Sequence, residues 1–222
     1  MKVPRRMCFS ATASFAAAAV TGVLGLMTLG RAHGQAQFVL AATPMIFAVQ
    51  QAIEGTLWLA LETGTGGAIV TNLTYAYLLF AEAWWPVFVP VAVLLVEPDE
   101  QRRRFIMLTL GVGLAVGAYL FWIVFSAQPR AAIIDDHLVY ATGRPSAFIA
   151  QPAYLVATVA PLLLSSQCVL KALGLVVLVG AVTAYLLYAA AFVSVWCFFA
   201  AVASAVLVYH FARLKQAAPQ QH

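Results

Sequence analysis

The sequence predicts an all-α, multi-pass membrane protein, in which seven transmembrane helices form a single domain over residues 1–222. Composition is the first observation behind this prediction: 64% of the residues are hydrophobic and only 9% are charged, whereas a soluble domain carries about 25% charged residues. The second is length, because a helix needs roughly 20 apolar residues to cross the hydrocarbon. The runs are also too long and unbroken for the alternating strands of a porin-type barrel.

Seven apolar runs mark the expected helices. In chain order they cover residues 10–30, 38–61, 68–91, 105–127, 148–165, 169–189 and 192–214. The fifth run is short and its link to the sixth is tight, so this pair is the weakest part of the pattern. The longest polar connection, residues 128–147, is expected to be an outer loop, in which 131–134 could pair with 137–140 as a small hairpin over the bundle.

The distribution of Lys and Arg predicts the orientation, because cytoplasmic loops carry the excess of positive charge. With seven spans, one side holds Arg31, Arg102, Arg103, Arg104, Lys171, Arg213 and Lys215. The opposite side holds Arg130 and Arg144, and also Lys2, Arg5 and Arg6 of the N-terminal tail. The first side is therefore expected in the cytoplasm, with the N-terminus outside and the C-terminus inside, in the inner (cytoplasmic) membrane. This topology accounts for the net charge of +4 without a nucleic-acid partner.

An alternative for the first run is a signal peptide. Residues 1–6 form a basic segment, an apolar stretch follows, and Ala32-His33-Gly34 resembles a cleavage site. The apolar stretch is long for that role, but cleavage would leave six spans.

Two carboxylates fall inside predicted spans, where a charge costs roughly 2.5–3.5 kcal/mol on insertion scales and therefore usually has a partner or a task. Glu54 lies in the second run with Gln50 and Trp58 one turn to either side, and Gln51 lies close to the same face. We expect this polar and aromatic stripe to face the bundle interior, in contact with polar groups of other helices.

Glu82 is the second carboxylate, near the middle of the third run. Pro86 has no N–H, so in a regular helix the carbonyl of Glu82 would lose its donor. A kink at this point, with Trp85 beside it, could hold a cation or water. The alternative is structural, a protonated Glu82 hydrogen-bonded to a neighbouring helix.

A metal site is a further hypothesis. Cys8 and Cys197 are expected at similar depths in the first and last helices, which commonly adjoin in a seven-helix bundle. Together with Glu54, and with His137 from the outer loop, they would suit a transition metal or another cation. The alternative is that the two cysteines are separate small hydrophobes.

Several classes of protein are excluded by missing residues. The last run has no central Lys for a retinal Schiff base, its His210 stands alone where a bis-His haem needs two facing histidines, and the chain has no Walker motif.

The segment Met7-Cys8-Phe9-Ser10-Ala11-Thr12-Ala13-Ser14-Phe15 resembles the start of a family of uncharacterised bacterial integral membrane proteins. Three further segments are similar: residues 50–55, Trp85-Pro86, and residues 194–201. The resemblance spans nearly the whole chain and implies no established activity. It singles out Cys8, Glu54, Trp85, Trp196 and Cys197.

The leading hypothesis is a protein that binds or transports a cation or small solute in the bundle interior and otherwise contacts membrane lipids. The residues expected to bind it are polar and aromatic side chains of the spans: Glu54, Gln50, Gln51, Glu82, Trp58, Trp85 and Trp196. One alternative is a membrane-embedded metal-dependent enzyme acting on a lipid or quinone through Cys8, Cys197, Glu54 and His137. The other is a sensor or accessory membrane subunit.

Overall fold

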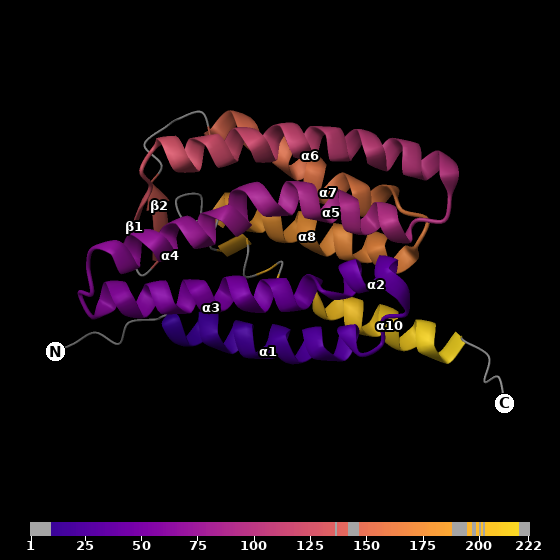
Figure 1. Ribbon diagram of the computed structural model, residues 1–222, viewed down its shortest axis with the longest axis horizontal. Helices are drawn as coiled ribbons and strands as arrows, with labels where there is room; N and C mark the ends of the chain where they lie inside the picture. The colour runs from indigo at the N-terminus through magenta and orange to yellow at the C-terminus, as the bar shows by residue number, and fades with distance from the viewer. Residues whose placement is uncertain are drawn as a thin grey trace.

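The computed structural model describes residues 10–135, 137–141, 147–187, 195–196, 199, 201 and 203–217, with the backbone alone at 147–149 and 214–217. Its elements form a helical bundle with one small hairpin (Figure 1). They are α1 (Ala11–Leu29), α2 (Gly34–Ala41), α3 (Thr43–Glu62), α4 (Ala68–Leu78), the π-helical segment η1 (Leu79–Trp84), α5 (Trp85–Val96), α6 (Glu100–Ser126), β1 (Arg130–Ile134), β2 (His137–Ala141), α7 (Ala147–Leu164), α8 (Cys168–Leu187) and α10 (Ala205–Ala217).

Five helices of the described chain are long and apolar enough to cross a membrane, which indicates a multi-pass membrane protein. They are Ala11–Leu29, Gly34–Glu62, Ala68–Val96, Glu100–Ser126 and Cys168–Leu187. These correspond to the first four and the sixth of the seven expected spans. The expected fifth span is α7, whose apolar part is shorter, and the seventh lies partly outside the described residues. The count of seven and the orientation across the membrane stay predictions.

The bundle has two distinct ends (Figure 1). The β1–β2 hairpin lies at one end, where α3 ends and α4 begins, and we call this the hairpin end. The short helix α2 and the turn between α5 and α6 lie at the other, which we call the α2 end. The helix α1 begins at the hairpin end and α10 lies toward the α2 end, in contact with both α1 and α8.

The helices α1 and α3 pack along most of their length because α1 presents small side chains to α3. Its buried face carries small residues: Ala11, Ser14, Ala17, Thr21, Gly25 and Thr28. A Cβ atom at Gly25 would lie 2.8 Å from the backbone nitrogen of Met45, so only glycine allows this approach. Close packing of small residues is what holds helices together where lipid offers no hydrophobic force.

A similar close approach joins α6 to η1 and α5. A Cβ atom at Gly113 would overlap the carbonyl oxygen of Pro86, and one at Gly117 would lie 2.9 Å from the carbonyl oxygen of Ala83. The helix α6 therefore lies directly against the backbone of the irregular segment, and two glycines one turn apart make this contact possible.

The π-helical segment η1 lies where the sequence predicts a kink after Glu82. In a π-helix each amide bonds to the carbonyl five residues earlier, so Pro86, which has no N–H, leaves the carbonyl of Ala81 without its donor. The structure supplies another, because the hydroxyl of Tyr154 in α7 donates a hydrogen bond of 2.6 Å to Ala81 O. The sequence-based expectation placed the lost donor at the carbonyl of Glu82, and the structure shows that the neighbouring carbonyl of Ala81 is bonded to Tyr154.

The hairpin pairs Arg130–Ile134 with His137–Ala141 in antiparallel register, Ile134 opposite His137. Its turn places Asp135 at a φ of +50°, a conformation that Asp tolerates better than most residues. Leu138 of β2 is buried with Trp58 of α3, and the ring of Tyr140 stacks on that of Tyr77 at 4.8 Å. The hairpin is thereby fixed onto the ends of α3 and α4.

At the α2 end, Glu97 joins the α5–α6 turn to the α7–α8 turn. Its Oε2 atom accepts hydrogen bonds from the hydroxyl of Ser165 at 2.7 Å and the amide of Ser166 at 2.8 Å, and its Oε1 atom accepts one from the amide of Asp99 at 3.2 Å. The guanidinium of Arg102 donates to the carbonyl of Leu164 at 2.8 Å. In sequence Glu97 belongs to a polar connection, but it is 2% exposed because the second turn folds over it.

Candidate functional site

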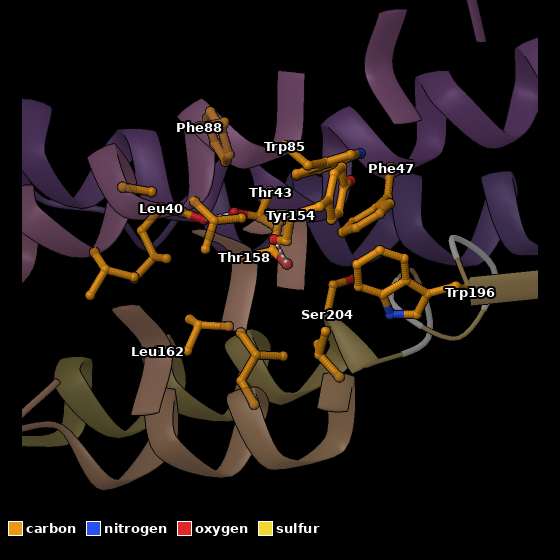
Figure 2. A pocket seen from close by; sticks show the side chains of 15 residues that line it. Leu40, Thr43, Phe47, Trp85, Phe88, Tyr154, Thr158, Leu162, Trp196 and Ser204 are labelled. Atoms are coloured by element: carbon orange, nitrogen blue, oxygen red, sulfur yellow. Dashed lines mark hydrogen bonds between the residues drawn. The ribbon is translucent and has the colours of Figure 1, made fainter. Parts of the chain in front are cut away.

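A cavity lies in the bundle interior between α2, α3, α5, α7, α8 and the chain leading into α10 (Figure 2). Fifteen residues line it: Leu40, Thr43, Phe47, Trp85, Phe88, Val89, Ala92, Val93, Tyr154, Thr158, Leu162, Leu173, Val177, Trp196 and Ser204. The volume open to the centres of water-sized molecules is about 60 Å³, and on that measure a single water needs roughly 10–15 Å³. The cavity is therefore large enough for a small organic molecule.

The cavity is apolar although four of its residues carry hydroxyls, because each hydroxyl donates to a backbone carbonyl. Thr43 donates to Leu40 O at 2.7 Å, Thr158 to Tyr154 O at 2.9 Å, and Ser204 to Ala201 O at 2.5 Å. The fourth, Tyr154, makes the bond to Ala81 O. These donors are engaged in the helices, and what remains facing the cavity is carbon.

Aromatic rings gather at one end of the cavity, and aliphatic side chains line the other (Figure 2). Phe47 stacks on Trp85 with ring centroids 4.0 Å apart, and Tyr154 meets Trp196 edge to face at 5.1 Å. These rings come from four separate parts of the chain, so the aromatic end exists only in the folded bundle.

Behind the aromatic end lies a buried polar group on α3, formed by the side chains of Gln50, Gln51 and Glu54. The indole nitrogen of Trp85 donates a hydrogen bond of 2.7 Å to Oε1 of Gln50, so one side chain both lines the cavity and contacts the polar group. Gln50 and Gln51 are fully buried and Glu54 is 1% exposed. The hydroxyl of Ser14 in α1 lies 3.5 Å from Oε2 of Glu54. Gln50, Gln51 and Glu54 thus face the interior, as the sequence predicts.

The amides of this group are incompletely hydrogen-bonded. Both Nε2 and Oε1 of Gln51, and Nε2 of Gln50, are buried without a partner in the described part of the chain. A buried polar atom without a hydrogen bond costs about 1–3 kcal/mol and is uncommon in native structures. Such atoms call for an explanation, and a bound molecule is one.

The other expected site residues lie apart from the cavity. Glu82 is half-buried in η1 and does not line it. Trp58 is 3% exposed and packs beneath the hairpin with Leu138, and His137 begins β2 at the hairpin end. Trp85 and Trp196 are the two expected residues that line the cavity.

The proposed metal ligands are only partly placed. Cys8 and Cys197 lie outside the described residues. Within the residues that are described, no three His, Cys, Asp or Glu side chains gather as a metal-binding group. The packing of α1 against α10 agrees with the expectation that the first and last helices adjoin.

Tyr154 and the smaller residues that complete the cavity were not predicted from the sequence. Tyr154, Thr158 and Ser204 sit in apolar runs where a single hydroxyl carries no distinctive pattern. Pro86 was the one available signal for Tyr154, because a proline inside a helix leaves a carbonyl that another group must satisfy.

The sequence model of a family of unknown function, DUF6629, matches residues 7–222. The chain belongs to this family. The match begins at Met7, the first residue of the amino-terminal Met-Cys-Phe-Ser motif, and continues to the last residue of the chain. No curated protein and no solved structure matches the chain. Membership of DUF6629 thus assigns no activity, and the geometry of the bundle interior becomes the basis for assigning a function.

Proposed function

We propose that this DUF6629 protein binds a small, largely apolar solute in the cavity between α3, α5, α7 and α8. The observation that carries the proposal is the cavity itself, with its carbon lining and aromatic end. Ligand sites are typically concave and mostly apolar, with a few polar groups that fix orientation. Apolar cavities also stay dry and take apolar guests.

The lining favours a small organic solute over a free cation. A cation needs several oxygen ligands, whereas the surface that faces the cavity is almost entirely carbon. The cavity therefore offers a cation too few oxygen ligands to replace its hydration shell. The metal-dependent enzyme stays an alternative, since Cys8 and Cys197 are outside the described chain.

Fluorescence quenching tests the proposal, because a bromoalkane quenches tryptophan on contact and Trp85 and Trp196 line the cavity. The purified protein is placed in lipid nanodiscs, with Trp84→Phe and Trp122→Phe removing two tryptophans that are 44% and 54% exposed. Titration with 1-bromooctane is expected to quench the remaining tryptophans with a saturable component, beyond the linear effect of probe dissolved in the lipid.

A matched pair of substitutions locates the binding. Val89→Phe places a larger side chain in the cavity wall and is expected to abolish the saturable component. Val179→Phe makes the same change on α8 at a residue that is 63% exposed, and binding is expected to survive. Linear quenching alone in the parent protein, or equal binding in both variants, would show that the cavity is not a binding site.

A further inference from the structure

The face of α3 that lines the cavity continues past Phe47 to the polar group, whose amides do not themselves line the cavity. Thr43 and Phe47 line the cavity, and Gln50 and Gln51 follow Phe47 by three and four residues. Side chains at these spacings share a helix face, so the two amides lie about one turn, roughly 5.4 Å, beyond the aromatic end. Trp85 connects the two regions, because its ring lines the cavity while its nitrogen donates to Gln50.

The two amides present an unused set of donors and acceptors. A glutamine side chain has two N–H donors and one carbonyl acceptor. Gln50 uses its carbonyl for Trp85, and its Nε2 has no partner among the described residues, while Gln51 has none there for either atom. The site therefore offers N–H groups from two residues and one free carbonyl, all completely buried.

We infer that the molecule bound in the cavity is an amphiphile with an uncharged head group, a hydroxyl or a carboxamide, which hydrogen-bonds to Gln50 and Gln51. Its head accepts from the Nε2 groups of Gln50 and Gln51 and donates to Oε1 of Gln51, while its apolar part fills the cavity. This inference rests on the proposed function and adds the chemical class of the ligand.

Only an uncharged head matches both kinds of partner. An ionised carboxylate accepts hydrogen bonds but donates none, so Oε1 of Gln51 would remain unpaired. It would also lie near Glu54, with no buried Lys or Arg in the described chain to balance it. A quaternary ammonium group neither donates nor accepts a hydrogen bond, which would leave the amides of Gln50 and Gln51 unpaired. A hydroxyl or a carboxamide does both and brings no charge into the membrane interior, where charge is costly.

Four brominated probes that share an eight-carbon chain test this class. They are 1-bromooctane, 8-bromo-1-octanol, 8-bromooctanoate and (8-bromooctyl)trimethylammonium, titrated into the same nanodisc protein and compared at equal concentration in the lipid. The alcohol is expected to bind about tenfold more tightly than 1-bromooctane, corresponding to one or two net hydrogen bonds. The two charged probes are expected to bind less tightly than the alcohol.

Gln51→Leu removes the head-group partner and keeps a side chain of similar bulk, and Gln51→Met serves as a second variant that preserves its length. Both are expected to bind 1-bromooctane as the parent does and to lose the preference for the alcohol. Without probe, Gln51→Leu is expected to melt above the parent, because an apolar side chain replaces an unpaired amide. Gln101→Leu, at an exposed position of α6, is the control and is expected to change neither result.

The outcomes distinguish failure of this inference from failure of the proposed function. Three results would overturn the inference and leave the cavity as a binding site. The first is saturable binding of 1-bromooctane with no preference for the alcohol, and the second is a preference that survives in both Gln51 variants. The third is tighter binding of a charged probe. Absence of saturable quenching by all four probes would instead overturn the proposed function.

Discussion

The hydroxyl of Tyr154 lies 2.6 Å from the carbonyl oxygen of Ala81 and donates a hydrogen bond to it. This bond joins α7 to the one irregular turn of the α4–η1–α5 helix. Both residues are buried, so the membrane offers no water that could replace the donor. Tyr154 also lines the cavity, and the stability of the irregular turn and the shape of the cavity therefore depend on the same side chain.

Tyr154→Phe should lower the stability of the protein by about 1–3 kcal/mol, because it leaves the buried carbonyl of Ala81 unsatisfied. The measurement is the thermal unfolding midpoint in detergent, monitored by tryptophan fluorescence. Tyr119→Phe removes a hydroxyl at a residue that is 38% exposed and should cost no more than about 0.5 kcal/mol. Equal midpoints for the two variants would mean that the bond to Ala81 contributes nothing.

Gly113→Ala should be strongly destabilising, since its Cβ atom would overlap the carbonyl oxygen of Pro86 and force α6 away from α5. Overpacking of this kind costs about 1–3 kcal/mol or more. Gly111→Ala is a control on the same helix, because nothing lies within 4 Å of the added atom, and it should be neutral or stabilising by up to about 1 kcal/mol. Thermal midpoints of the pair, measured side by side, test this; a Gly113 variant as stable as the Gly111 variant would contradict the packing.

The α2 end should lose stability in acid through Glu97. Desolvation by burial raises the pKa of Glu97, but the hydrogen bonds from Ser166, Ser165 and Asp99 outweigh it, and the pKa is lowered below its usual value of 4.5. The folded state then binds fewer protons than the unfolded state. The stabilisation from Glu97 is therefore fully present above pH of about 4.5 and is lost as the pH falls through the lowered pKa.

Glu97→Gln should reduce the stability at pH 7 by about 1–3 kcal/mol, because an amide cannot accept from all the donors that face the carboxylate. Between pH 6 and pH 3 the unfolding midpoint of the variant should fall less than that of the parent. Glu62→Gln, at an exposed residue, should keep the pH dependence of the parent. Parallel pH profiles for the Glu97 variant and the parent would refute the assignment.

The sequence predicted the helical class and the burial of Gln50, Gln51 and Glu54, because hydrophobic length and helical spacing are local properties. It also marked Trp85-Pro86 as a special point. It did not predict the cavity, whose walls come from elements far apart in the chain, nor the burial of Glu97, which depends on one turn folding over another. Polar residues in loops look alike in sequence whether they are solvated or covered.

The same limit applies to Tyr154. Nothing in the run around it distinguishes a tyrosine that satisfies a carbonyl of another helix from one that faces lipid. The partner became identifiable only when the π geometry of η1 was known, since in a π-helix the amide position of Pro86 corresponds to the carbonyl of Ala81.

The number of residues in η1 determines the direction in which α5 faces. A π turn amounts to an α-helix with one additional residue, and each residue of an α-helix advances the chain by about 100°. Deleting one residue between Leu79 and Trp84 would restore a regular helix but rotate all of α5 by that angle relative to α4. Trp84 is 44% exposed and Trp85 is 4% exposed. The length of this one turn, independently of its chemistry, decides which of two adjacent tryptophans faces inward.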